Sequence, residues 1–260
     1  MIYSLIFLAI GSYFLGNINW ALIISKLKKN DIRKLGSGNP GTLNMSRNFG
    51  LKIGLLTFFL DILKGAIPTL VSFLIFNGKY FEISGFSISV FAMYLTGFCA
   101  VLGHIYPVVL KFKGGKGIAS TIGVLLVCEI TSGWVWTVVC IMALVAAGLF
   151  IYFTEFGAMG SFIAITPPAV FGAIRLFVFN NAYPQRVVFL FVTSMLIFFI
   201  CFFTWFAHRK NIERMLAGEE HPTSIKKMFL NSKLKKIDAK SKKEEMMSIK
   251  SQVDKTINGE

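Results

Sequence analysis

Long runs without a single charged residue constrain this chain more than any other feature. Residues 1–25 and 86–110 contain no Asp, Glu, Lys or Arg, and about 20 mostly apolar residues in one helix suffice to cross a bilayer. Hydrophobic residues make up 55% of the chain and charged residues 15%, whereas a soluble domain has about 25% charged residues. The composition therefore predicts a polytopic membrane protein and excludes a disordered chain, a collagen-like repeat and a soluble disulfide scaffold.

We expect an all-α integral membrane protein with seven transmembrane helices. The predicted spans are residues 2–25, 52–76, 86–110, 117–132, 134–153, 158–178 and 187–207. The fourth span is short and carries Glu129 near its end. The second contains Asp61 and Lys64, which share one helix face and can form an ion pair. These boundaries predict a membrane domain over residues 1–221 and a Lys-rich, largely disordered cytoplasmic tail over residues 222–260.

Lys and Arg residues fall almost entirely on one side of the predicted bilayer. Seven lie in the loop 26–52, three lie in 111–116 and thirteen lie from residue 209 onward. The opposite side receives at most three, namely Lys79, Arg175 and Arg186. Because short cytoplasmic loops are enriched in Lys and Arg, we expect the amino terminus outside the cell and the carboxyl terminus in the cytoplasm.

Two glycine-rich loops lie on this predicted cytoplasmic side. The first covers residues 33–44 and contains Gly36, Gly38 and Gly41; the second covers residues 111–117 and contains Gly114, Gly115 and Gly117. Backbone N–H groups in such loops, and the free N–H groups of a helix that follows, can close around a phosphate-sized anion. Each loop alone is about as well explained as a flexible connection, but the two together favour an anion site. The second loop lacks the spacing of a Walker A motif, which argues against nucleotide binding.

Three further polar positions lie where predicted spans end. His104 is close to the end of the third span, and we expect it to be a hydrogen-bonded packing residue. His208 and Asn211 lie three residues apart after the seventh span and would share one face of a helix. They form either an ordinary interfacial cluster or a polar pair that faces the anion site. The four cysteines lie in apolar runs without metal-ligand spacing, so we expect no metal and no other cofactor.

At these positions the chain resembles the bacterial acyl-phosphate-dependent glycerol-3-phosphate acyltransferases of the PlsY type. The resemblance covers roughly residues 5–221 and rests on Gly11-Ser12 with Gly16, on residues 31–41 with Asn44 and Arg47, on Gly103-His104 with Pro107 and residues 111–117, and on His208-Arg209 with Asn211, Ile212 and Gly218. It implies a seven-helix enzyme of the bacterial cell membrane whose active site is on the cytoplasmic side. It also implies transfer of a fatty acyl group from acyl phosphate to the 1-hydroxyl of sn-glycerol 3-phosphate, the first acylation of phospholipid synthesis, with lysophosphatidic acid and phosphate as products.

The resemblance further implies roles for individual residues. The expected catalytic residues are Ser37, Arg47, Lys116 and His208. The expected substrate-binding residues are Gly36, Gly38, Asn39, Gly41, Thr42, Asn44, Gly114, Gly115, Gly117 and Asn211. The chain departs from the family pattern at Phe14, where the family usually has Pro. It departs again at Leu43, where the family usually has a small hydroxyl residue; here Thr42 lies one position earlier.

Three groups are candidates to accept the proton of the substrate hydroxyl. They are His208 as general base, Ser37 as a nucleophile, and the phosphate of the substrate itself, which the resemblance favours. Two other classes stay open: a transporter of a phosphorylated small solute, and an inactive homologue because of Leu43. Few polar residues at mid-membrane and the lack of an inverted repeat argue against the transporter. The expected partners are the two substrates and the lipid bilayer, without nucleic acid or an obligate protein partner.

Overall fold

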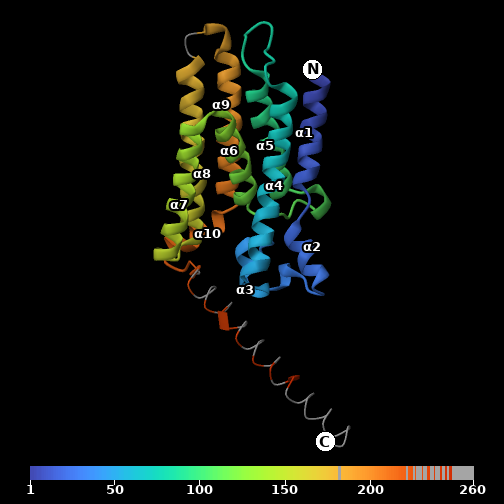
Figure 1. Ribbon diagram of the computed structural model, residues 1–260, viewed down its shortest axis with the longest axis vertical. Helices are drawn as coiled ribbons and strands as arrows, with labels where there is room; N and C mark the ends of the chain where they lie inside the picture. Colours follow the sequence, from blue (N-terminus) through green and yellow to red (C-terminus); the bar gives the residue numbers. More distant parts are fainter. Residues whose placement is uncertain are drawn as a thin grey trace, which may run out of the picture.

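The computed structural model describes residues 1–180, 183–220 and 222–224, and beyond them positions 226, 230, 233–234, 237, 241, 244 and 246–247. Its helices are α1 (Ile2–Gly16), α2 (Trp20–Leu27), α3 (Thr42–Phe49), α4 (Leu51–Phe76), α5 (Ile88–Ile105), α6 (Ile118–Ser132), α7 (Trp134–Thr154), α8 (Gly157–Asn180), α9 (Val187–Phe206) and α10 (Arg209–Leu216), with short 3-10 turns η1 (Ile32–Lys34), η2 (Val108–Leu110) and η3 (Pro184–Arg186). The long helices run side by side as one bundle (Figure 1). The prediction of an all-helical membrane protein is confirmed.

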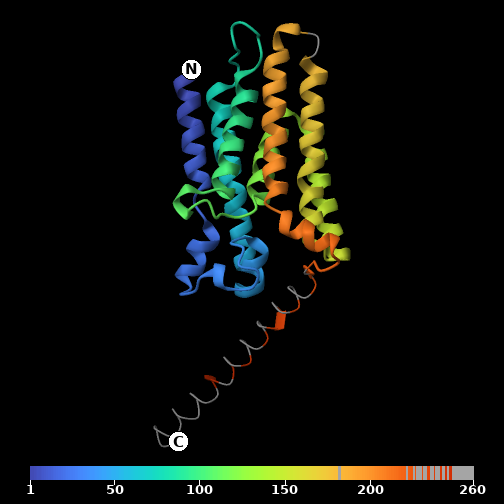
Figure 2. The same ribbon diagram turned by 180° about the vertical axis from the view of Figure 1, so that it is seen from behind.

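Six of the described helical segments are long and apolar enough to cross a membrane, counting α1 and α2 as one. The helix expected as the fourth span forms as α6, but its 15 residues give a length of about 22 Å, short of the roughly 30 Å hydrocarbon core. Gly133 ends it, with a φ of 126° that only glycine adopts easily. α6 packs against α4, α5, α7 and α8, and its turn into α7 lies nearer the middle of the bundle than the loops after α4 and α8 (Figures 1 and 2).

The span predicted over residues 2–25 is interrupted after Gly16. Asn19 begins α2 as its N-cap, and its side chain accepts a backbone hydrogen bond from the first turn. An interruption of this kind leaves carbonyl groups without helical partners. The Nζ of Lys64 in α4 lies within hydrogen-bond distance of two such carbonyl oxygens, at 3.4 Å from that of Gly16 and 2.7 Å from that of Ile18.

The predicted ion pair within α4 is confirmed. Lys64 Nζ lies 3.0 Å from Asp61 Oδ1, and both side chains are buried. Lys64 Nζ also lies 2.8 Å from Nδ1 of His104, close to the end of α5. Lys64 therefore connects α4 to the interrupted helix and to α5, three elements that are far apart in the sequence.

The loops that are rich in Lys and Arg gather toward one end of the bundle, which we call the basic end (residues 26–52, 111–116 and 208–220). The amino terminus and the loops after α4 and α8 lie toward the opposite end in both views (Figures 1 and 2). This grouping agrees with the prediction that the loops rich in Lys and Arg lie on one side of the bilayer. The predicted disorder of residues 222–260 falls mostly outside the described residues.

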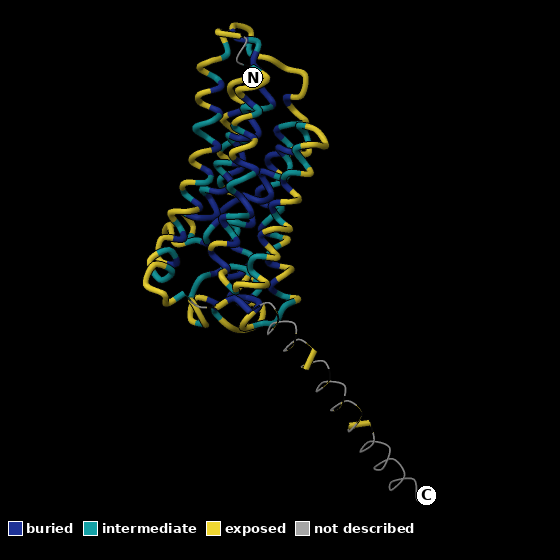
Figure 3. The backbone as a smooth tube through the Cα atoms, turned by 90° about the vertical axis from the view of Figure 1, so that its left-hand side faces the viewer, coloured by how far each residue is buried: buried dark blue, intermediate teal, exposed yellow. Residues whose placement is uncertain are grey.

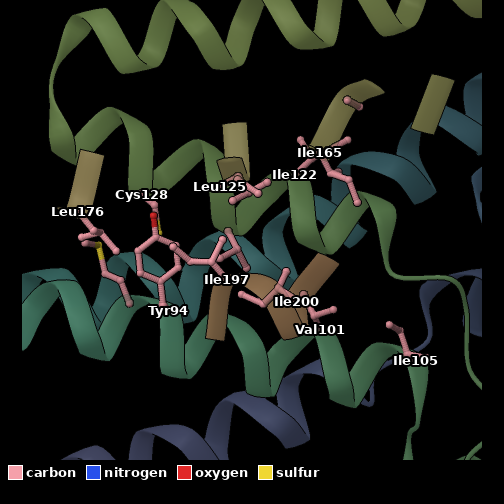
Figure 4. Packing of buried hydrophobic residues seen from close by; sticks show 14 of the residues in the cluster. Tyr94, Val101, Ile105, Ile122, Leu125, Cys128, Ile165, Leu176, Ile197 and Ile200 are labelled. Atoms are coloured by element: carbon pink, nitrogen blue, oxygen red, sulfur yellow. The ribbon is translucent and has the colours of Figure 1, made fainter. Parts of the chain in front are cut away.

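Buried residues fill the interior of the bundle, and exposed residues line its outside (Figure 3). The main core lies among α5, α6, α8 and α9 and includes Tyr94, Leu125, Ile165 and Ile200 (Figure 4). Many large apolar side chains face outward, as lipid contact requires. The four cysteines are free thiols that are buried or half-buried, as expected for small apolar packing residues.

Candidate active site

The second glycine-rich loop is fastened to the end of α5 by its own backbone. The N–H of Gly114 donates to the carbonyl of Ile105 at 3.2 Å, and the N–H of Gly115 donates to that of His104 at 3.1 Å. A Cβ at Gly114 would overlap the carbonyl of His104, and one at Gly115 would overlap the imidazole ring of His104. These two glycines therefore allow a close backbone approach, and their N–H groups are already occupied, which differs from the expected anion cradle.

Free backbone donors remain immediately after these two glycines. The N–H groups of Lys116 and Gly117 and those of the first turn of α6 have no hydrogen-bond partner within the described residues. They lie at the amino end of a helix, where the helix dipole favours an anion. An anion site at this loop would therefore use residues 116–120.

The side chain of Lys116 joins a polar group built from α10 and the segment after it. Lys116 Nζ donates to Asn211 Oδ1. Asn211 Nδ2 donates to Glu220 Oε1 at 2.7 Å, and Arg214 Nε donates to Glu220 Oε2 at 3.2 Å. We call these residues, together with Arg47 and His208, the Lys116 cluster. The predicted residues Arg47, Lys116, His208 and Asn211 are thus brought together at the basic end.

Burial and charge lower the pKa of Lys116 to about 8. Partial desolvation is the largest cause, because it disfavours the charged ammonium. The carboxylate of Glu220 opposes this effect, while Arg214 and Arg47 add to it. Lys116 is therefore mostly charged at neutral pH, with its pKa only about one unit above it.

His208 lies at the junction of α9 and α10 and is 3% exposed. Its Nδ1 lies 2.8 Å from the carbonyl oxygen of Thr204. A carbonyl can only accept, so Nδ1 carries the proton and Nε2 is left as an acceptor. Burial, and next the charge of Lys116, lower the pKa of His208 to about 4. His208 is therefore neutral at pH 7, and no carboxylate among the described residues hydrogen-bonds to it.

The first glycine-rich loop is held together by Asn44. Its Oδ1 accepts from the N–H of Ser37 at 3.2 Å, and its Nδ2 donates to the carbonyls of Leu35 and Ile32 at 2.9 and 3.3 Å. Asn44 is 2% exposed, so in this structure it supports the loop from inside. Gly36 has a φ of 54°, and a Cβ there would overlap the Asn44 amide.

The other predicted residues of the first loop are more exposed than Asn44. Ser37 is exposed, and its hydroxyl makes no hydrogen bond to the described residues. Asn39 and Thr42 are half-buried, and their side chains likewise make no hydrogen bond to the described residues. Gly41 begins α3, whose first N–H groups are open donors. This loop thus offers a second helix start at the basic end.

Arg47 contacts a segment that the sequence patterns did not assign to the site. Its guanidinium donates to the carbonyl of Pro222 and to Thr223 Oγ1, both at 3.2 Å. The N–H of Thr223 in turn donates to the carbonyl of Glu155 at 2.7 Å. Sequence reasoning placed Arg214 around His208 and Asn211 but missed Glu220 and Thr223 as neighbours of the site. Glu220 had no usable signal, since residues 209–220 contain as many acidic as basic residues.

Comparisons with known proteins agree on one family. The family described as glycerol-3-phosphate acyltransferase matches residues 6–218. The glycerol-3-phosphate acyltransferase of Aquifex aeolicus is 37% identical over 217 residues, 83% of this chain and 97% of that protein. The one from Mycoplasmopsis pulmonis is 33% identical over 211 residues, 81% and 89% of the two chains. A crystal structure of PlsY, an integral membrane glycerol 3-phosphate acyltransferase in its glycerol 3-phosphate form, is 33% identical, with a TM-score of 0.65 and coverage of 87% of this chain and 98% of that chain.

We predict that anion binding at the Lys116 cluster weakens as the pH rises through about 8. The ammonium of Lys116 is present below this pKa and is lost above it, and a hydrogen bond to a charged group contributes about 1.5–3 kcal/mol. Sulfate is a suitable probe because its own charge is constant in this range. Its Kd, measured by calorimetry from pH 6.5 to 9.5, should rise about tenfold or more.

The matched control for this pH dependence is Lys116→Arg, whose guanidinium stays charged throughout. The Kd for sulfate of this variant should not change across the same pH range. An equal rise in both proteins would show that another group titrates.

Proposed function

The chain belongs to the glycerol-3-phosphate acyltransferase family, and from this premise we propose how its site carries out the reaction. The donor is acyl phosphate, and the acceptor is the 1-hydroxyl of sn-glycerol 3-phosphate. The products are lysophosphatidic acid and inorganic phosphate. One observation carries the proposal: Lys116, in the second glycine-rich loop, bonds to Asn211 and interacts electrostatically with His208 and with Arg47 of α3, all at the basic end.

Both substrates carry a phosphate, and the two loops offer two helix starts with free N–H donors. In our proposal one loop holds glycerol 3-phosphate and the other holds the phosphate of the donor. The acyl chain lies between helices in contact with lipid. Holding both reactants in line contributes about 7–11 kcal/mol to lowering the barrier. Lys116 and Arg47 stabilise the charge that develops, at about 3 kcal/mol for a well-placed donor.

The reaction balances without a cofactor. The oxygen of the 1-hydroxyl forms a bond to the acyl carbon, and the bond from that carbon to the phosphate oxygen breaks. We propose that a phosphate oxygen of the substrate takes the hydroxyl proton. His208 is a weak base because its pKa is about 4, and Ser37 has no described base within hydrogen-bond distance. His208 then acts by orienting glycerol 3-phosphate through Nε2.

We propose the following placement in the bacterial cell membrane. All seven helices cross, with the amino terminus outside and the basic end in the cytoplasm. The short α6 can do so because α4, α5, α7 and α8 pack along it, so that protein and not lipid surrounds most of its length. Residues 1–221 form the catalytic membrane domain, and residues 222–260 form a cytoplasmic tail whose first residues, Pro222 and Thr223, bond to Arg47. We propose no obligate protein partner.

The donor is tested with purified full-length protein and labelled glycerol 3-phosphate. Palmitoyl phosphate, palmitoyl-CoA and palmitoyl acyl carrier protein are offered in parallel. We expect lysophosphatidic acid from palmitoyl phosphate alone. Arg47→Ala and Lys116→Ala should each lower kcat/KM by at least about 100-fold, because each removes a charge-stabilising donor.

Lys28→Ala is the matched control for these two variants, since Lys28 is an exposed lysine at the same end outside the cluster. Its kcat/KM should stay at the wild-type value. Product from a thioester would refute the donor. Absence of product with every donor would refute the proposed reaction and favour a transporter or an inactive homologue.

His208→Ala separates binding from proton transfer. If His208 orients the substrate, KM for glycerol 3-phosphate should rise about tenfold while kcat changes little. Steady-state kinetics with saturating palmitoyl phosphate measure both constants. A loss of kcat with unchanged KM would instead make His208 the general base.

The membrane orientation is tested by cysteine labelling in a variant that lacks the four native cysteines. Lys34→Cys lies at the basic end and Lys79→Cys at the opposite end, and both positions are exposed. A membrane-impermeant maleimide should label only Lys79→Cys in intact cells and both variants after permeabilisation. Labelling of Lys34→Cys in intact cells would reverse the proposed orientation.

A further inference from the structure

We infer that His104 is a positioning residue for the loop that carries Lys116, and that Lys64 holds His104 in place for this purpose. The inference rests on the anion-binding role proposed above for Lys116. It assigns a use to a buried group that the reaction itself does not employ. Sequence reasoning expected His104 to be a packing residue only.

His104 holds the residue before Lys116 from two directions. Its backbone carbonyl accepts the N–H of Gly115 at 3.1 Å. The Nε2 edge of its ring lies directly against Gly115, where a Cβ would overlap it. His104 is only 5% exposed, so surrounding atoms confine the ring. The backbone conformation of the residue before Lys116 therefore depends on the position of this imidazole.

The ring orientation is set from its other side. Lys64 Nζ lies 2.8 Å from Nδ1 of His104 and 3.0 Å from Asp61 Oδ1. An ammonium has hydrogens to donate and no lone pair to accept with, so Nδ1 accepts and Nε2 carries the proton. The only other acidic or basic group that faces His104 among the described residues is Asp61, at 3.9 Å from Nδ1. These contacts therefore set one tautomer and one ring orientation of His104.

Lys64 is itself fixed by more than the ion pair. It donates to the carbonyl of Ile18 at 2.7 Å, where the first helix is interrupted. The contacts thus run without a break from α1 and α4 through His104 and Gly115 to Lys116. At the far end, Lys116 donates to Asn211. A displacement of about 1 Å in a group that holds substrate can cost about 100-fold in rate, so this support affects function.

The test uses full-length protein and the Kd of glycerol 3-phosphate, measured by calorimetry. His104→Asn keeps an acceptor for Lys64 but lacks the part of the ring that contacts Gly115. We expect the Kd to rise about tenfold, because Lys116 is then misplaced. In a Lys116→Ala background the same substitution should change the Kd by less than about twofold, since residues that act through one group are not additive.

Thr96→Val is the matched control. Thr96 belongs to α5 as well, is buried and bonds to Ser72 of α4 at 3.0 Å, but lies away from the loop. The Kd of glycerol 3-phosphate for Thr96→Val should equal that for the wild type. Thermal unfolding confirms that each variant is folded, and His104→Gln replaces His104→Asn if the latter does not fold.

Three results would overturn the inference: an unchanged Kd in His104→Asn, an equal loss in the Lys116→Ala background, or an equal loss in Thr96→Val. Failure of the proposed function looks different. In that case wild-type protein does not bind glycerol 3-phosphate, or Lys116→Ala binds it as well as the wild type does.

Discussion

The buried ammonium of Lys64 is the interaction on which the arrangement of this bundle depends. Removing a charged group from water costs several kcal/mol, and this cost is offset only by close partners. Lys64 has Asp61 on its own helix, a carbonyl of the interrupted first helix and the ring of His104. An interruption inside a membrane helix is tolerated only where other groups satisfy its backbone. One side chain thus allows the break and joins α1, α4 and α5.

The Lys116 cluster has a different balance of charge. Its cations are Arg47, Lys116 and Arg214, and its one described carboxylate is Glu220, which bonds to Asn211 and Arg214. Glu220 therefore partly neutralises the site before any substrate arrives. Three cations against this one carboxylate leave the neutralisation incomplete. An excess of positive charge under partial burial is what a site for doubly charged phosphates needs.

Local sequence patterns were sufficient for part of this picture. Hydropathy located every long helix, the spacing of Asp61 and Lys64 predicted their ion pair, and the spacing of His208 and Asn211 indicated one shared site. The contacts of Lys64 with Ile18, of His104 with Gly115 and of Arg47 with Thr223 were not predicted. They are tertiary contacts that no periodicity of the sequence records. The short length of α6 was predicted as well, since the span 117–132 corresponds to Ile118–Ser132, which Gly133 ends.

The cluster takes its parts from distant places in the chain, with Arg47 in α3 and Glu220 after α10. This division has a consequence for biosynthesis. The first glycine-rich loop leaves the ribosome long before α9, α10 and the following residues have been made. A nascent chain that already contains most of the membrane helices still lacks His208, Asn211 and Glu220. Under the proposed function, chains cut short by interrupted translation or by proteolysis ahead of α10 would be inactive membrane proteins, and activity would arise only when α10 joins the bundle.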